Sequence, residues 1–357
     1  PIAIALGSLI GRSAYGLDVL KELDPEGLAA GKAMVERKCI SIALKEQVDK
    51  LYIEVVSHRG DEESRVVISH AHTHFSYIAR NGEVLYNEES GASHEELEAD
   101  EEIALNFGLV YDFAMQMPLE EIRFILETAR VNEAAAKASM EAGCYGHTVS
   151  QTFAGEFGKR FLGDSVYTHM LAMTAAACDA RMDGAMIPVM SNSGSGNQGL
   201  SATLPVVSFA KDMHSSEEQL IRALMLSHLM VIYIKQSLGR LSALCGCVVA
   251  ATGASCGITY LMGGTREQLT YAIKNMIGNI TGMICDGAKP SCALKVSSGV
   301  STAMLSALMA MEQKVVTPVE GIIDEDVDRS IANLTSIGSK GMEATDRLVL
   351  DIMTAKA

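Results

Sequence analysis

Five of the eight cysteines could bind metal, and they fall into two groups along the second half of the chain: Cys245, Cys247 and Cys256, then Cys285 and Cys292. Glycine and proline between the last two predict an irregular loop, which can wrap a metal. A zinc finger would need a C-x-x-C pair, which is absent, and four thiolates would close the metal to substrate. Three thiolates on an iron–sulfur cluster leave the fourth iron open as a Lewis acid. Packed free thiols are the alternative interpretation.

A glycine-rich loop is the second segment that could carry chemistry. Residues 194–199 match the dinucleotide fingerprint G-x-G-x-x-G, and Asp212 stands near the position of a ribose-binding acid. A dinucleotide-dependent oxidoreductase is therefore an alternative function. Pro205 should interrupt the helix that this fingerprint needs, and no strand–helix alternation precedes it. Closely spaced backbone N–H groups and short polar side chains instead suit the carboxylate of an amino acid, and a plain polar turn is the third interpretation.

Three histidines, His70, His72 and His74, occupy alternate positions in a run rich in β-branched residues. On a strand they would project from one face, about 7 Å apart. A flat strand spreads three imidazoles too far for one ion, so a dedicated metal site is disfavoured. His228 lies in an apolar helical pattern and is expected to be a packed core histidine.

Three segments resemble the iron–sulfur-dependent L-cysteine desulfidases, a group that is also called the L-serine dehydratase alpha-subunit family. The segments are residues 190–199 (MSNSGSGNQG), 239–247 (GRLSALCGC) and 282–287 (GMICDG). The resemblance extends over nearly the whole chain. It implies a 4Fe-4S cluster with one open iron, held by three cysteines, and no PLP.

The resemblance assigns the metal ligands to Cys285, Cys292 and one member of the pair Cys245 and Cys247. The family's interval between its first two ligands favours Cys245. A His-Thr-Asn element of the family is matched by His72 and Thr73, with His74 where asparagine is usual, and it implies a site in the cleft between two domains. The candidate substrate-binding residues are His72, Thr73, Ser193, Gly194, Ser195, Gly196 and Asn197.

The resemblance implies a carbon–sulfur lyase that converts L-cysteine to sulfide, ammonia and pyruvate through aminoacrylate. Iron–sulfur L-serine dehydratase is the alternative, although that group separates its second and third ligands by more residues than lie between Cys285 and Cys292. A non-catalytic metal-binding protein is a further hypothesis. The family's proposed catalytic cysteine would precede Pro1. We therefore expect a truncated start and leave the catalytic residues, including the general base, unassigned.

The elements that must position these residues predict an α+β fold, in which a large, mainly helical domain carries the cluster beside a smaller α/β sheet domain. Residues 51–57, 65–78 and 84–86 are rich in Val, Ile and Tyr, and Asn81-Gly82 supplies a hairpin turn. Residues 88–102 are glutamate-rich and predict a surface connection. Helix starts are indicated by Ser216 with Gln219 and by Thr265 with Gln268.

The expected domains are an N-terminal helix over 1–28 that belongs to the helical domain, a small α+β domain over 29–100, and a helical cluster-binding domain over 101–357. Residues 184–210 and 241–265 carry no charge and exceed the length of a bilayer span. Their polar residues would be stranded in lipid, so we expect them to form buried walls of an active site.

Charge excludes several kinds of partner. The 44 acidic and 29 basic residues give a formal charge of −15, which repels phosphate backbones and anionic lipid. We therefore expect neither nucleic acid nor membrane as a partner, but a small amino acid. The scattered cysteines indicate reduced thiols and a cytoplasmic protein. The sequence is compatible with a homodimer.

Overall fold

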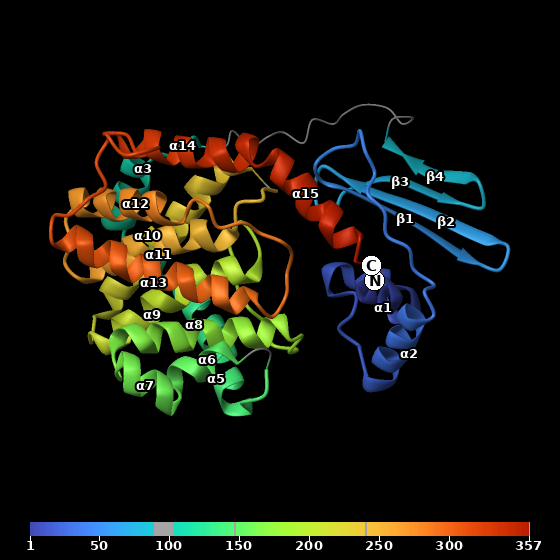
Figure 1. Cartoon of the computed structure of the whole chain (residues 1–357), viewed down its shortest axis with the longest axis horizontal. Helices are drawn as coiled ribbons and strands as arrows, with labels where there is room; N and C mark the ends of the chain where they lie inside the picture. Colours follow the sequence, from blue (N-terminus) through green and yellow to red (C-terminus); the bar gives the residue numbers. More distant parts are fainter. Residues whose placement is uncertain (89–102, 146–147, 240, 357) are drawn as a thin grey trace. The chain divides into compact units, whose positions relative to one another are not determined.

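The computed structural model describes residues 1–88, 103–145, 148–239 and 241–356. Their contacts divide the chain into two compact units, which are Pro1–Ile103 with Arg347–Ala357, and Ala104–Asp346. The smaller unit holds the sheet and the larger one is helical (Figure 1). This confirms the predicted α+β class with a large helical part. The predicted acidic connection, beyond Glu88, lies outside the described residues, as does Arg240.

The smaller unit contains the elements α1 (Ile2–Ile10), η1 (Ser13–Asp18), α2 (Pro25–Glu36), β1 (Tyr52–Arg59), β2 (Glu62–Ser69), β3 (Phe75–Arg80) and β4 (Glu83–Asn87). Its strands form one antiparallel sheet in the order β1-β2-β3-β4. The turn between β3 and β4 is the predicted Asn81-Gly82 turn, in which both residues have positive φ, 50° and 80°. Asn81 Oδ1 accepts a hydrogen bond from the Glu63 N–H at 2.8 Å, which fastens the turn to the neighbouring strand.

The histidine run differs from the expectation. Residues 65–78 form parts of two strands and not one, and the chain turns between them. His70 begins this turn with a φ of 65°, a left-handed conformation that no β-strand contains. His72 and His74 follow within the turn. The prediction that the three side chains share one strand face is therefore wrong.

Two of these histidines contact acidic residues instead. His70 Nδ1 lies 3.1 Å from Asp49 Oδ2, and His74 Nε2 lies 3.3 Å from Glu88 Oε1. The His70 and His74 ring centroids are 6.0 Å apart. Separate polar contacts thus fix the turn.

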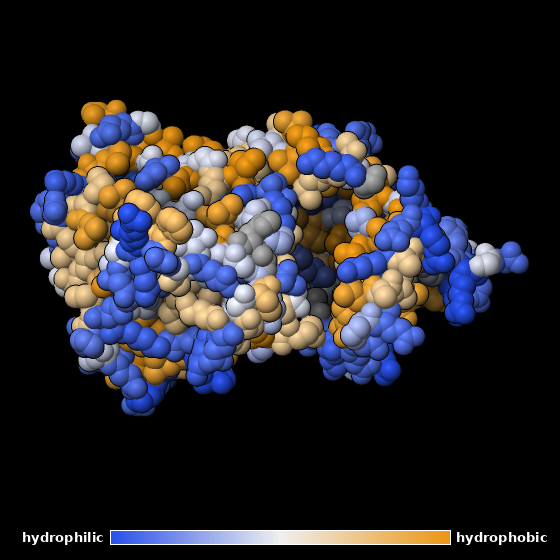
Figure 2. All heavy atoms as spheres, turned by 60° about the horizontal axis from the view of Figure 1, so that its bottom comes forward, coloured by the Kyte–Doolittle hydropathy of each residue, from blue (hydrophilic) through white to orange (hydrophobic). Residues whose placement is uncertain are grey.

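One face of the sheet carries a cluster of apolar side chains, with Ser57, Ser64 and Arg80 at its end. Cross-strand pairs place seven apolar side chains on this face, namely Ile53, Val55, Val66, Ile68, Phe75, Ile78 and Tyr86. Four of them are exposed and three are half-buried. Exposed apolar residues also occur elsewhere in the chain, and Figure 2 shows hydrophobic groups between hydrophilic ones on the face that it views. We call the seven residues the apolar sheet face.

The larger unit contains the helices α3 (Phe107–Gln116), α4 (Leu119–Ile122), η3 (Arg123–Ile125), α5 (Leu126–Ala142), α6 (Val149–Ala154), α7 (Glu156–Leu162), α8 (Val166–Met182), α9 (Gly196–Asp212), α10 (Glu217–Leu238), α11 (Gly246–Leu261), α12 (Arg266–Ile280), α13 (Cys292–Met311), α14 (Val327–Ser336) and η4 (Ile337–Gly341). The last helix, α15 (Glu343–Thr354), begins in this unit and continues into the smaller one. The division by contacts groups residues 1–28 and the end of α15 with the sheet, whereas the sequence assigned both to the helical domain. Contacts alone do not test domain boundaries, so the expected assignment stays a prediction.

Helix α11 lies at the centre of the helical unit, packed against α9, α10, α12 and α13 (Figure 1). Residues 247–259 of α11 are all buried. Two glycines let α10 approach closely, because a Cβ at Gly253 would lie 2.3 Å from the Ser227 carbonyl oxygen and one at Gly257 would lie 2.9 Å from that of Ala223. Glycine lowers helix propensity, and this close packing explains why α11 contains it.

Burial is confirmed for parts of the two uncharged stretches, since residues 197–210 of α9 and 247–259 of α11 are all buried, whereas residues 184–196 are half-buried or exposed. That these stretches line an active site stays a prediction. The capping residues Ser216 with Gln219 and Thr265 with Gln268 form capping boxes at α10 and α12, as predicted. Helix α13 is long and apolar enough to cross a bilayer, but half of its most apolar window is buried inside the protein. A core helix has the same properties.

The effect predicted for Pro205 is wrong. Helix α9 continues through Pro205 to Asp212, although proline cannot donate a backbone hydrogen bond and crowds the preceding turn. Every residue from Asn197 to Ala210 is buried. Burial of the whole helix against α8, α10 and α11 therefore outweighs the local cost of the proline.

A buried polar network joins α5, α9 and α10. His228 is 3% exposed, and burial lowers its pKa to about 4, so its imidazole is neutral. Asn192 Nδ2 donates to His228 Nδ1 at 3.0 Å, and His228 Nε2 lies 3.0 Å from Thr203 Oγ1. Asn132 Nδ2 donates to Thr203 Oγ1 at 3.1 Å. His228 is thus a core histidine, as predicted, and it holds the segment that leads into α9.

The neutral state of His228 predicts a pH-dependent stability. The ordinary pKa of 6.5 falls to about 4 in the folded protein, so between these pH values the unfolded chain binds a proton that the folded chain does not. The free energy of unfolding should fall as the pH decreases through this window, by up to about 3 kcal/mol from this residue. Urea denaturation at closely spaced pH values measures it.

His228→Gln removes this titration together with the two hydrogen bonds. The variant should be less stable than the parent at pH 7, and the stability difference should shrink as the pH falls from 6.5 to 4. A difference that stays constant across the window would contradict the assigned neutral state.

Candidate functional site

Two segments that are far apart in sequence lie side by side through backbone hydrogen bonds. The Cys245 N–H donates to the Met283 carbonyl at 3.0 Å, and the Cys285 N–H donates to the Ala243 carbonyl at 2.6 Å. These bonds form an isolated antiparallel bridge between Leu244 and Ile284. The bridge places Cys245 opposite Met283 and Cys285 opposite Ala243, so the two cysteines lie diagonally across it where α11 begins.

The segment from Cys285 to Cys292 is an irregular loop, as predicted, and Cys292 is the first residue of α13. Gly287 has a φ of 91°, which favours glycine. The Cys292 thiol donates to the Gly287 carbonyl at 3.6 Å. Lys289 Nζ donates to the backbone carbonyls of Asp286 and Gly287 at 3.0 and 3.3 Å. The loop therefore folds back on itself and brings Cys292 toward Cys285.

Asp286 is an ionised anchor of this loop. Hydrogen bonds from Lys289 and then from Lys295 lower the pKa of its carboxyl to about 2. Lys289 Nζ lies 2.5 Å from Asp286 Oδ1, and Lys295 pairs with the same oxygen. Lys295 Nζ also donates to the Ile284 carbonyl at 2.9 Å. Two ammonium groups thus lie beside the thiols, where they would favour negative charge.

The thiols differ in exposure and are close enough to influence one another. Cys245 is 6% exposed, whereas Cys285 is exposed and Cys292 half-buried. A hydrogen bond with Cys247, together with burial, raises the pKa of Cys245 to about 12. A hydrogen bond with Cys245 and burial raise the pKa of Cys285. Burial also raises the pKa of Cys178 on α8, with added effects from Cys292 and Cys245. Five thiols therefore share one neighbourhood.

The thiols of Cys245, Cys285 and Cys292 are the donor type that an iron–sulfur cluster requires. Within the described ranges, no three His, Cys, Asp or Glu side chains are grouped so that they could hold one metal ion. In an iron–sulfur cluster each cysteine binds a different iron, so the thiols surround a volume and not a point. Cys245 and Cys285 have raised pKa values and need a cation beside them to ionise. The chemistry of the thiols therefore fits the expected group.

The glycine-rich loop leads into the first turn of α9. Ser195 is its N-cap residue, and its side chain makes no capping hydrogen bond. Ser191 Oγ donates to the Ser195 carbonyl at 2.8 Å, and Gln198 Nε2 donates to Ser193 Oγ at 3.1 Å. Ser195 and Gly194 are exposed and Ser193 is half-buried. The loop thus offers uncapped N–H groups at a helix start, where an anion binds favourably.

An arginine missed by the sequence analysis lies against this loop. Arg181, near the end of α8, donates from Nη1 to Asn197 Oδ1 at 3.2 Å. A Cβ at Gly196 would lie 2.3 Å from Arg181 Nε, so the guanidinium can pack here only against glycine. Asn197 is 6% exposed, and it contacts Arg181 instead of facing the solvent. Nothing in the spacing of residues 181 and 196 could have indicated this contact.

The loop and the thiols lie close together within the helical unit. A Cβ at Gly246, which follows Cys245, would lie 3.2 Å from Gln198 Oε1, so the first turns of α9 and α11 are neighbours. His72 and Thr73 are exposed residues of the β2–β3 turn in the sheet unit. Their predicted contact with substrate stays a prediction, as does the cleft between domains.

The context that a dinucleotide site requires is missing. A Rossmann fingerprint follows a parallel strand directly, whereas residues 183–195 lie between α8 and α9 without a strand. The strands that the structure describes form one antiparallel sheet in the other unit. The match at residues 194–199 therefore does not indicate a dinucleotide site.

Comparison with known proteins gives the same family along nearly the whole chain. A family model described as serine dehydratase alpha chain matches residues 15–351. A UPF0597 protein of Parabacteroides distasonis is 75% identical over 358 residues, covering 100% of this chain and 83% of that protein. A UPF0597 protein of Bacteroides fragilis is 62% identical over 357 residues, with 100% and 83% covered. One of Oleidesulfovibrio alaskensis is 45% identical over 358 residues, with 99% and 82% covered. This chain belongs to the serine dehydratase alpha chain family.

Proposed function

We propose that this protein is an iron–sulfur lyase that acts on L-cysteine and releases sulfide. The observation that carries the proposal is the bridge between Leu244 and Ile284, which sets Cys245 diagonally across from Cys285 while the following loop brings back Cys292. These three thiols would hold the cluster. An iron without a protein ligand would supply a Lewis acid for the substrate heteroatom.

Cys245 is the better third ligand of its pair. Its backbone is bonded directly to the segment of Cys285. Cys247 lies two residues after Cys245, in the first turn of α11, where its carbonyl oxygen would be 3.3 Å from a Cβ at Gly299 of α13. Cys247 stays the alternative ligand.

The substrate carboxylate would bind between the start of α9 and Arg181. The first N–H groups of α9 and the Arg181 guanidinium both favour an anion, and Ser193 and Ser195 add hydroxyl donors. Asn197, predicted to contact substrate, would instead position Arg181 through its 3.2 Å hydrogen bond. A fixed carboxylate would orient the Cα–Cβ bond relative to the thiols of Cys245 and Cys285.

The overall reaction balances without an external oxidant. Removal of the α-proton and departure of sulfide from Cβ form aminoacrylate, and water converts its imine tautomer to pyruvate and ammonia. Lys289 and Lys295 lie beside Cys285 through Asp286, and their positive charges would favour a negatively charged leaving group in this neighbourhood. The general base stays unassigned.

L-serine deamination is the second candidate. The family description of serine dehydratase alpha chain favours it, and the same carboxylate site would serve either substrate. The short interval between Cys285 and Cys292 supports the desulfidase, as does the match between a soft thiolate leaving group and thiolate-ligated iron.

Removal of a ligand thiol should abolish cluster binding. We expect Cys285→Ser and Cys292→Ser to lose most of their iron and sulfide, because each removes one of three protein thiolates. Of Cys245→Ser and Cys247→Ser, the first should show the severe loss. Iron and acid-labile sulfide assays of anaerobically prepared protein measure it.

Cys39→Ser is the matched control, because Cys39 is exposed and lies in the sheet unit. It should retain full iron content. Full iron content in Cys285→Ser or Cys292→Ser would refute the ligand assignment, and equal mild losses in the Cys245 and Cys247 variants would exclude both as ligands.

Loss of the Arg181 guanidinium should weaken substrate binding and leave the iron content unchanged. Arg181→Gln removes a charged hydrogen-bond donor worth roughly 1.5–3 kcal/mol, so KM should rise about ten- to a hundredfold. Asn197→Ala should raise KM by less, because it only releases Arg181. Arg160→Gln, at an exposed position on α7, is the control. An unchanged KM in Arg181→Gln would remove Arg181 from the site.

The substrate preference is tested with full-length protein that retains its cluster. We expect sulfide release from L-cysteine to exceed ammonia release from L-serine in kcat/KM, because thiolate is the softer ligand and the better leaving group. Sulfide, ammonia and pyruvate are measured with both amino acids under the same anaerobic conditions. A preference for serine would establish the second candidate, and consumption of neither would favour a non-catalytic role.

A further inference from the structure

A cavity of about 700 Å³ opens in the helical unit, between α5, α6, α8 and α9. Its volume is typical of sites for small molecules. None of the candidate metal ligands or glycine-loop residues lines it. The glycine-rich loop lies at the start of α9, whereas Ser208 and Lys211, near the end of α9, line the cavity. The cavity is therefore distinct from the site proposed above.

The cavity combines an apolar wall with a charged rim. Ala136 and Ala172 are buried beneath it, and Phe153 and Met173 are half-buried beside them. Alanines at these positions leave room that larger side chains would fill. The wall therefore suits an apolar group of a ligand.

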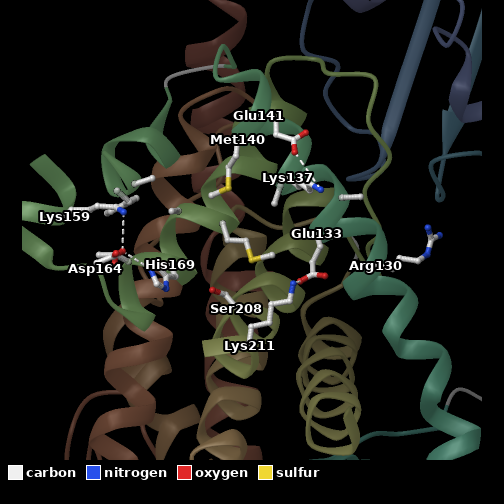
Figure 3. Close-up of a pocket in the computed structure, with 17 residues that line it drawn as sticks. Arg130, Glu133, Lys137, Met140, Glu141, Lys159, Asp164, His169, Ser208 and Lys211 are labelled. Carbon is white, nitrogen blue, oxygen red and sulfur yellow. Dashed lines mark hydrogen bonds and ion pairs between the residues drawn. The ribbon is translucent and has the colours of Figure 1, made fainter. Parts of the chain in front are cut away.

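Charges of both signs alternate around the rim (Figure 3). Lys211 of α9 pairs with Glu133 of α5. Lys137 Nζ lies 3.8 Å from Glu141 Oε1, and the two side chains point toward each other at one edge of the cavity (Figure 3). Each pair has at least one exposed partner, and ion pairs of this kind contribute little and can exchange partners at low cost.

The opposite edge of the rim has the same mixed character. Lys159 Nζ lies 3.5 Å from Asp164 Oδ1. His169 lies 2.9 Å from Asp164 and 2.7 Å from Asp212. With Arg130, the lining carries four basic side chains against three acidic ones, besides His169. It offers partners for both signs at once.

We propose that this cavity binds a zwitterion with an apolar side chain, of the class of free apolar amino acids and short apolar peptides. The carboxylate would pair with Lys211 or Lys137, the ammonium group with Glu133 or Glu141, and the side chain would lie on Ala172 and Met173. A ligand that carries only one charge could contact rim groups of only one sign and would lack the second charged hydrogen bond.

The proposal is tested by calorimetric titration of the full chain with L-leucine and with L-leucyl-L-leucine, which distinguish the amino acid from the peptide. N-acetyl-L-leucine and L-leucinamide keep the side chain but carry one charge each. We expect saturable binding of at least one zwitterion, at least tenfold tighter than binding of both blocked analogues. Equal affinity for a blocked analogue, or no saturable binding of either zwitterion, would overturn the proposal.

Variants locate the binding in the cavity. Lys211→Gln and Glu133→Gln should each weaken binding at least tenfold, and Ala134→Phe should weaken it by narrowing the cavity from an exposed position. Lys314→Gln and Glu312→Gln remove the partners of an exposed ion pair 2.5 Å apart outside the cavity, and they should bind as the parent does. Unaltered affinity in all three cavity variants, each folded by circular dichroism, would overturn the proposal.

Binding should also survive in Cys285→Ser, because the cavity does not include the thiols. Loss of zwitterion binding in this variant, with the cavity intact, would place the ligand at the catalytic site and refute a separate one. Failure of the lyase activity leaves this test unaffected, since the readout is binding and not turnover.

Discussion

The candidate site depends on two backbone hydrogen bonds between residues 243–245 and 283–285. These bonds close a helical hairpin: α11 has 16 residues and α12 has 15, so their lengths are about 24 and 22 Å. The two helices pack against each other and nearly match in length. The end of α12 therefore lies beside the start of α11. Backbone geometry thus brings the segments of the two thiols together.

The positions of these thiols also depend on how tightly α11 is held. A helix whose residues 247–259 are all buried cannot slide along its axis without disturbing α9, α10, α12 and α13. The glycines at 253 and 257 bring its backbone to within contact distance of α10. The buried and almost uncharged centre of the unit therefore fixes the positions of Cys245 and of the first turn of α9. Charged side chains are found mainly toward the outer helices, as at the rim of the cavity.

Sequence reasoning worked where the signal is local. The hairpin at Asn81-Gly82, the capping boxes at Ser216 and Thr265, and the irregular loop after Cys285 each depend on residues a few positions apart, and all three are present. It failed where tertiary packing decides. The turn at His70 interrupts a run with high strand propensity, and the helix across Pro205 is kept by burial that no local rule includes.

The site was predictable in part for the same reason. The cysteines are chemically distinctive, and a family resemblance could select among them. Arg181 is one of many charged residues, and its contact with Asn197 requires the end of α8 to meet the start of α9. That meeting is a property of the fold. The glycine at position 196 is the sequence feature that reflects this contact, because a larger residue there would exclude the Arg181 guanidinium.

The apolar sheet face affects how an isolated fragment of this chain would behave in solution. Strands β1 and β4 are the edges of the sheet among the described residues, and the face between them carries seven apolar side chains, from Ile53 to Tyr86. A fragment limited to the sheet unit would expose unpaired strand edges together with an apolar surface. Such a surface is a template for strand pairing between molecules. Expressed alone, this fragment would self-associate and accumulate in inclusion bodies.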